Sequence, residues 1–211
     1  MPAAIDGLPR DHRGYPVPAE SRWANGDPQL AIQDHRRFFL LHAAGCCAIC
    51  GCPFRPGDVR YRLFADGDAR AAKATGGCRR SDGPGHRECM LFSAAACPFF
   101  ATAGARAVHP THKGLGRGAK AAVFGFQRVQ MFLGRDDGGE VRTIEFVYDG
   151  LCDELWFRTA DQVVEHLKTA MAHAPHIDVR QRQYWSSDDT AESMWQDAVQ
   201  RFKQKHPLPQ P

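Results

Sequence analysis

Alternation of apolar and polar side chains predicts strands in two parts of the chain. Residues 59–64 alternate apolar and basic side chains over their first four positions, as a strand with one buried face does. Residues 121–133 and 141–148 are also strand-like, and the glycine- and aspartate-rich segment between them, 134–139, predicts a hairpin turn. A short third strand is expected at 154–157. The C-terminal half should therefore contain an antiparallel sheet.

Apolar side chains spaced three or four residues apart predict helices elsewhere. Residues 30–44 have apolar positions around a charged segment, and residues 87–96, rich in Ala, Leu, Met and Phe, are followed by the helix-stopping Pro98. A capping box opens a helix over 160–173, and an amphipathic pattern predicts a last helix over 189–205. This order of elements predicts an α+β fold in which helices cover one face of the antiparallel sheet.

The chain divides into four stretches by composition. Residues 1–28 hold five of the fourteen prolines and should form an extended N-terminal arm. Residues 29–100 combine a helix with a cysteine-rich module, and residues 101–120 form a polar connector. Residues 121–211 supply the hairpin and the C-terminal helices. With 43% hydrophobic residues, the parts can bury one shared core.

Two residue pairs in the second stretch have the spacing of metal ligands. Cys47-x-x-Cys50 is followed by Gly51, which lets the backbone curl under an ion and point N–H groups at the sulfurs. His86-x-x-Cys89 suits the first turn of a helix, where residues three apart share a face. Three thiolates and one imidazole make a tetrahedral site, so the sequence predicts a structural Zn2+ bound by Cys47, Cys50, His86 and Cys89.

The distribution of the cysteines supports metal over other uses of thiols. Seven of the eight lie between residues 46 and 97, which random use in a core would not produce. Asp6, Pro9 and Arg10 stand where a secretory segment needs apolar residues, so a reducing, cytoplasmic location is expected and disulfides are not. An iron–sulfur cluster and a purely thiol core are the alternatives.

Two further points about the ligands stay open at this level. Cys78 or Cys97 can replace His86 in the shell, or the spare thiols can form a second site.

The 35 residues between the two ligand pairs leave room for a β-hairpin. A knuckle, a hairpin and then a helix carrying the last ligands is the order of a treble-clef finger, so a treble-clef-like module is expected.

Several motifs together carry a resemblance to a known family. Arg13-Gly14-Tyr15-Pro16-Val17-Pro18, Cys47-x-x-Cys50-Gly51, His86-Arg87-x-Cys89 and Ala96-Cys97-Pro98-Phe99 resemble those of small proteins from bacteria and bacteriophages. The resemblance spans most of residues 8–173 and implies a zinc-binding protein, of phage or prophage origin, whose biochemical role is unassigned. In that family the positions matching Cys78 and Cys97 also tend to be cysteine. The chain departs from the pattern in an arginine-rich insert near 60–80 and a long tail after 176.

Motifs of zinc enzymes are incomplete in this sequence. A metalloprotease His-Glu-x-x-His is absent. Glu88 follows His86 at the offset found in nucleotide deaminases, but the Pro-Cys-x-x-Cys element of those enzymes is missing. Because four protein ligands close a zinc site, no catalytic residue is predicted. Glu88, between the ligands His86 and Cys89, is expected to face solvent, and the alternative is that it acts as an acid or base.

Charge suggests a binding role. Eight basic residues fall within 33 positions and, if they share one face, can contact phosphates; the alternative is dispersed surface charge that also neutralises the thiolates. They are Arg55, Arg60, Arg62, Arg70, Lys73, Arg79, Arg80 and Arg87. We therefore expect a zinc-stabilised protein that recognises nucleic acid or a protein partner without catalysis of its own. The alternative is a zinc-dependent treble-clef nuclease that uses His109 or His112. No apolar run reaches the length of a membrane span, so no membrane partner is expected.

Overall fold

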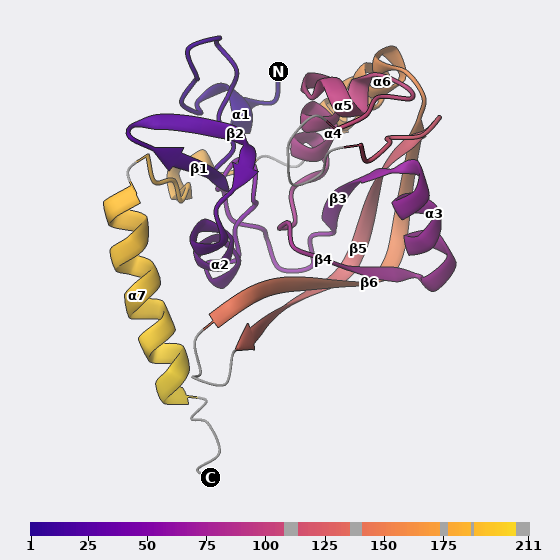
Figure 1. The fold of residues 1–211 in the computed structure, drawn as a ribbon. Helices are drawn as coiled ribbons and strands as arrows, with labels where there is room; N and C mark the ends of the chain where they lie inside the picture. Colours follow the sequence, from indigo (N-terminus) through magenta and orange to yellow (C-terminus); the bar gives the residue numbers. More distant parts are fainter. Residues whose placement is uncertain (108–113, 136–140, 174–176, 187, 206–211) are drawn as a thin grey trace.

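A computed structural model describes residues 1–107, 114–135, 141–173, 177–186 and 188–205 (Figure 1). It contains helices and two antiparallel sheets, one of two strands and one of four. The predicted α+β class is therefore confirmed.

The larger sheet is built on one long hairpin. Strands β5 (Ala121–Arg135) and β6 (Val141–Phe157) pair from Ala121 opposite Phe157 to Arg135 opposite Val141. The strands predicted at 141–148 and 154–157 are thus a single strand. The chain does not turn between them because both parts pair with β5. Gly150 adopts a φ of +70° within the strand, and the register shifts nearby, between Gly125 and Phe126.

Two short strands complete this sheet at its opposite edges, in the order β3-β5-β6-β4. Strand β3 (Arg60–Ala65) pairs with β5, and β4 (Gly77–Arg80) pairs with β6. Helix α3 (Asp66–Thr75) joins them and ends at Gly76, whose φ is +71°. The hairpin predicted between the two ligand pairs is therefore wrong, because each strand pairs with the long hairpin and not with the other. The hairpin that a treble clef requires is not formed.

Both faces of the sheet are covered. Ala121 and Val123 of β5 face α4 (Arg87–Ala96) and α6 (Ala160–His173), which pack against each other. Successive side chains of a strand point to opposite faces, so Phe124 of β5 points the other way and packs with α3 and with helix α2 (His35–Ala43). Helices α4 and α6 thus share one face, whereas the predicted α2 and the unpredicted α3 lie on the other.

The N-terminal region contains more regular structure than an extended arm. It forms a short helix, α1 (Ala3–Asp6), and a hairpin of β1 (Ser21–Ala24) and β2 (Asp27–Gln33). Asn25 and Gly26 have φ values of 53° and 82°, as a tight hairpin turn requires. The predicted helix over 30–44 therefore begins only at His35, after Asp34 accepts a hydrogen bond from the amide of Arg36 as the N-cap.

The C-terminal helix packs back onto α2, an early helix of the chain. Two short elements, α5 (Pro98–Ala101) and a 3-10 turn (Val179–Gln181), precede it in the chain. The last helix, α7 (Asp188–Lys205), lies beside α2 (Figure 1). Trp195 of α7 packs edge-on against Phe39 of α2. None of the helices in the described segments combines the length and hydrophobicity needed to cross a bilayer.

Candidate metal centre

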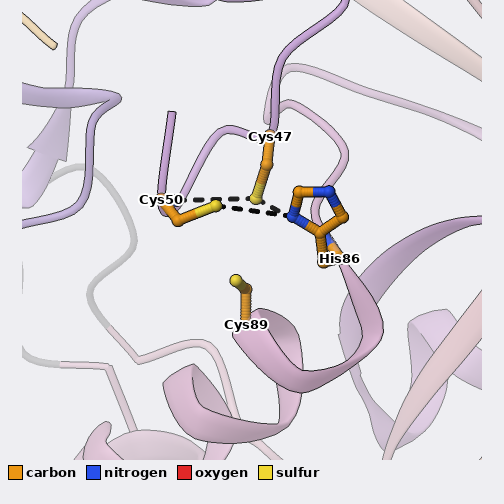
Figure 2. Close-up of side chains that lie close together, drawn as sticks. All are labelled: Cys47, Cys50, His86 and Cys89. Atoms are coloured by element: carbon orange, nitrogen blue, oxygen red, sulfur yellow. Dashed lines mark hydrogen bonds between the residues drawn. The ribbon is translucent and has the colours of Figure 1, made fainter. Parts of the chain in front are cut away.

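The four predicted ligands lie together in the folded chain (Figure 2). Cys47 and Cys50 come from the loop after α2, His86 immediately precedes α4, and Cys89 lies in the first turn of α4. Their potential ligand atoms all lie within 4.8 Å of one another. Neighbouring sulfurs of a tetrahedral site with Zn–S bonds of about 2.3 Å are about 3.8 Å apart, so the cluster has the size of a single-ion site.

The loop around Cys47 has the backbone geometry of a metal-binding knuckle. The amides of Cys50 and His86 point at the Cys47 sulfur, with N···S distances of 3.5 and 3.4 Å. Gly51 has a φ of +71°, and its amide donates to the Cys47 carbonyl. The Gly51 carbonyl accepts a hydrogen bond of 2.8 Å from the Gln183 amide. The C-terminal segment therefore lies directly against the knuckle.

The imidazole of His86 is held in position by neighbouring side chains. Its Nδ1 lies 3.4 Å from the Cys50 sulfur and points into the cluster, so Nδ1 is the atom placed to bind an ion (Figure 2). The ring of Phe54 packs against the imidazole, with 4.5 Å between ring centroids. The guanidinium of Arg60 in turn lies 3.8 Å from the Phe54 centroid. These contacts leave the imidazole little freedom to rotate away.

Interactions within the cluster shift the pKa values of its thiols in opposite directions. Burial opposes ionisation of Cys47, but hydrogen bonds from Cys50 and Cys89 and the charge of His86 lower its pKa well below the usual value. The hydrogen bond to Cys47 raises the pKa of Cys50 and also that of Cys89. The chain alone thus favours one thiolate stabilised by two thiols. A divalent cation supplies the positive charge that allows all three sulfurs to ionise.

The spare cysteines do not replace His86. Cys78 lies on β4 and packs against the core on the α3 face of the sheet, while Cys97 ends α4. All eight cysteines are free thiols. A sulfur that the sequence did not single out, that of Cys52, is fully buried beside the cluster, 3.7 Å from the Cys50 carbonyl oxygen. Hydrogen bonding to Cys50 and the nearby Arg182 lower the pKa of Cys52 to about 7.

Access to the cluster is limited to the imidazole. Cys47, Cys50 and Cys89 have no exposed surface, and His86 is 7% exposed. His86 lines a cavity of about 640 Å3 between residues 53–61 and the end of α6, and Glu88 lines the same cavity. Contrary to prediction, Glu88 is buried, and burial raises its pKa. The sulfurs are shielded from any molecule in that cavity.

The eight basic residues between positions 55 and 87 are mostly paired with carboxylates. Six of the eight form ion pairs, so they do not make one uncompensated face, and Arg60 stacks on Phe54. The pairs are Arg62–Asp82, Arg70–Asp66, Lys73–Glu154, Arg79–Glu145, Arg80–Asp68 and Arg87–Asp153. The candidate nuclease histidines, His109 and His112, lie outside the described residues.

Comparisons with protein-family models, with curated proteins and with solved structures find no match for this chain. The resemblance to the bacterial and bacteriophage family therefore stays a prediction.

Proposed function

We propose that the chain is a zinc-stabilised binding protein that recognises nucleic acid or a protein partner and performs no catalysis at the metal. One Zn2+ would be held by Cys47, Cys50, Cys89 and the Nδ1 of His86. The observation that carries the proposal is the gathering of these four atoms in a buried cluster. Soft thiolates with one imidazole suit Zn2+, whereas Mg2+ and Ca2+ prefer oxygen ligands.

A structural role for the ion follows from the number and burial of its ligands. A catalytic zinc usually keeps one position open for water, but four protein ligands close the shell. In the part of the chain that the structure describes, the three sulfurs are fully buried, which shields the ion from a substrate. By joining the loop after α2 to the start of α4, the ion would reinforce a contact in which the Ala48 amide donates to the Pro84 carbonyl at 2.9 Å. No observation favours the nuclease alternative.

Nucleic acid is the partner to test first. Arg70, Lys73 and Arg79 have side chains 67%, 56% and 68% exposed, and their ion pairs are of the kind that contributes at most about 1 kcal/mol in water. Phosphate groups can compete for such cations and release condensed counterions on binding. A cytoplasmic location and a phage or prophage origin belong to the same proposal.

Metal analysis together with a DNA-binding assay tests this function. We expect one zinc per chain, unfolding when a strong chelator removes it, and retention on immobilised DNA that falls as salt rises. Plasmid incubated with the zinc-loaded protein and added Mg2+ should stay intact. Absence of zinc would overturn the metal assignment, and nicking of the plasmid would overturn the non-catalytic role. A zinc-loaded protein that no DNA or RNA retains would overturn the nucleic-acid target and leave the protein partner to be tested.

A further inference from the structure

A second cavity lies away from the metal centre, between α3 and the sheet. It has a volume of about 390 Å3 and is lined by Arg70, Lys73, Lys120 and Trp156. Arg70 and Lys73 stand three residues apart on α3, Lys120 precedes β5, and Trp156 lies near the end of β6. We call these four residues the basic cleft. It combines three cations with one aromatic ring, and its size is at the low end of the range for small-ligand sites.

Two acidic residues hold the basic cleft in shape. Glu154 accepts from the Lys73 ammonium at 2.6 Å and from the Trp156 indole N–H at 3.1 Å, so one carboxylate oxygen positions both groups. Asp66 accepts from Arg70 Nε at 2.9 Å and from the backbone amide of residue 120 at 3.4 Å. The edge of Phe124 packs against the indole, with 5.3 Å between ring centroids. Arg70, Lys73 and the indole ring are therefore arranged before any ligand arrives.

The charges of the basic cleft do not cancel. Asp66 and Glu154 balance Arg70 and Lys73, which leaves Lys120, whose side chain forms no ion pair among the described residues. Its Nζ lies 5.8 Å from the Trp156 centroid, near the outer limit of a cation–π contact. A contact of that length is weak, so the ammonium can turn towards an anion. Arg70 also keeps its two terminal nitrogens for a ligand, since Asp66 engages only Nε.

We propose that the basic cleft binds one nucleotide unit, with the base stacked on Trp156 and the phosphate between Lys120 and the two cations of α3. Aromatic stacking with adjacent phosphate contacts is how proteins hold single strands, whose bases are free to leave the helical stack. A duplex keeps its bases paired and offers only its phosphates. This inference rests on the proposed function and names single-stranded nucleic acid as the target.

Fluorescence anisotropy with the full-length, zinc-loaded protein and a labelled oligothymidylate tests the inference. Lys120→Gln should weaken binding by about fivefold and reduce the salt slope by about 0.7, the value for one phosphate contact on a single strand. Trp156→Leu should weaken binding by about tenfold. Lys168→Gln controls for the loss of one lysine charge, because Lys168 lies on α6, across the sheet from α3. Thermal melting confirms that each variant folds.

The outcomes separate this inference from the proposed function. If the wild-type protein binds the strand and both cleft variants bind like Lys168→Gln, the basic cleft is not the site, although the protein still binds nucleic acid. If neither the wild-type protein nor the variants bind any nucleic acid although zinc is present, both the inference and the nucleic-acid target are wrong. If thymidine monophosphate displaces the labelled strand as well as an unlabelled strand does, the cleft binds a nucleotide, and its ligand is a free nucleotide and not a strand.

Discussion

Substitution of Gly51 by alanine tests how the knuckle is held against the rest of the fold. Any L-residue at a φ of +71° costs about 1–2 kcal/mol. At Gly51 a Cβ would also lie 2.1 Å from the carbonyl oxygen of Gln183, so the two backbone segments must move apart. That movement breaks the hydrogen bond between the Gln183 amide and the Gly51 carbonyl, and a buried unpaired group costs about 1–3 kcal/mol. Gly51→Ala should therefore lose about 2–5 kcal/mol of unfolding free energy.

Gly57→Ala supplies the matched control. Gly57 has a similar φ of +84°, but a Cβ at this position would meet no atom within 4 Å beyond its chain neighbours, so only the backbone cost of about 1–2 kcal/mol applies. Urea unfolding followed by tryptophan fluorescence, with zinc in excess for both variants, gives the two free energies. Equal losses for the two variants would refute the close contact between the knuckle and the C-terminal segment.

Three further predictions concern the metal and the core. Cys89→Ser should lose most of its zinc in a chelator competition, whereas Cys97→Ser should retain it. Equal loss of zinc by the two variants would show that the ligand set is wrong. Zinc should displace protons from Cys50 and Cys89, whose pKa values are raised, so its affinity should rise with pH by about tenfold per unit for each proton, and a flat profile in pH-controlled titrations would contradict this. Arg37→Ala removes a fully buried guanidinium and should cost about 3–5 kcal/mol in urea unfolding, against at most about 1 for the exposed Arg180→Ala. Similar values would show that the buried pair contributes no more than a surface one.

The gathering of Cys47, Cys50, His86 and Cys89 was predictable because its signal is local. Cys-x-x-Cys-Gly and His-x-x-Cys each place two ligands within a few residues, and one short turn or helix start fixes each pair. The helix over 87–96 was also predicted, because a stop at Pro98 and a run of helix formers are both visible in sequence.

Errors arose where the pairing of strands decides the structure. The apolar residues near 30–33 fit a helix or a strand, and their pairing with β1 selects the strand. Asn25-Gly26 is the local signal that could have revealed this hairpin. Asp149-Gly150 looks like a turn, but the long pairing with β5 carries the chain through it.

Burial of charged residues was also hidden from the sequence. Arg37 looks like the polar side of a helix, yet it is fully buried and pairs with Asp34, because α7 returns to cover α2. Glu88 is buried for a similar reason, since the 53–61 segment and the end of α6 enclose the start of α4. Neither helix carries information about the segment that covers it.

X-ray absorption at the zinc edge tests the central claim most directly. We predict three sulfur neighbours at about 2.3 Å and one nitrogen neighbour at about 2.0 Å in the purified protein. Four sulfurs would show that a thiol such as Cys52 takes the place of His86. A shell dominated by oxygen would contradict a structural site formed by Cys47, Cys50, His86 and Cys89.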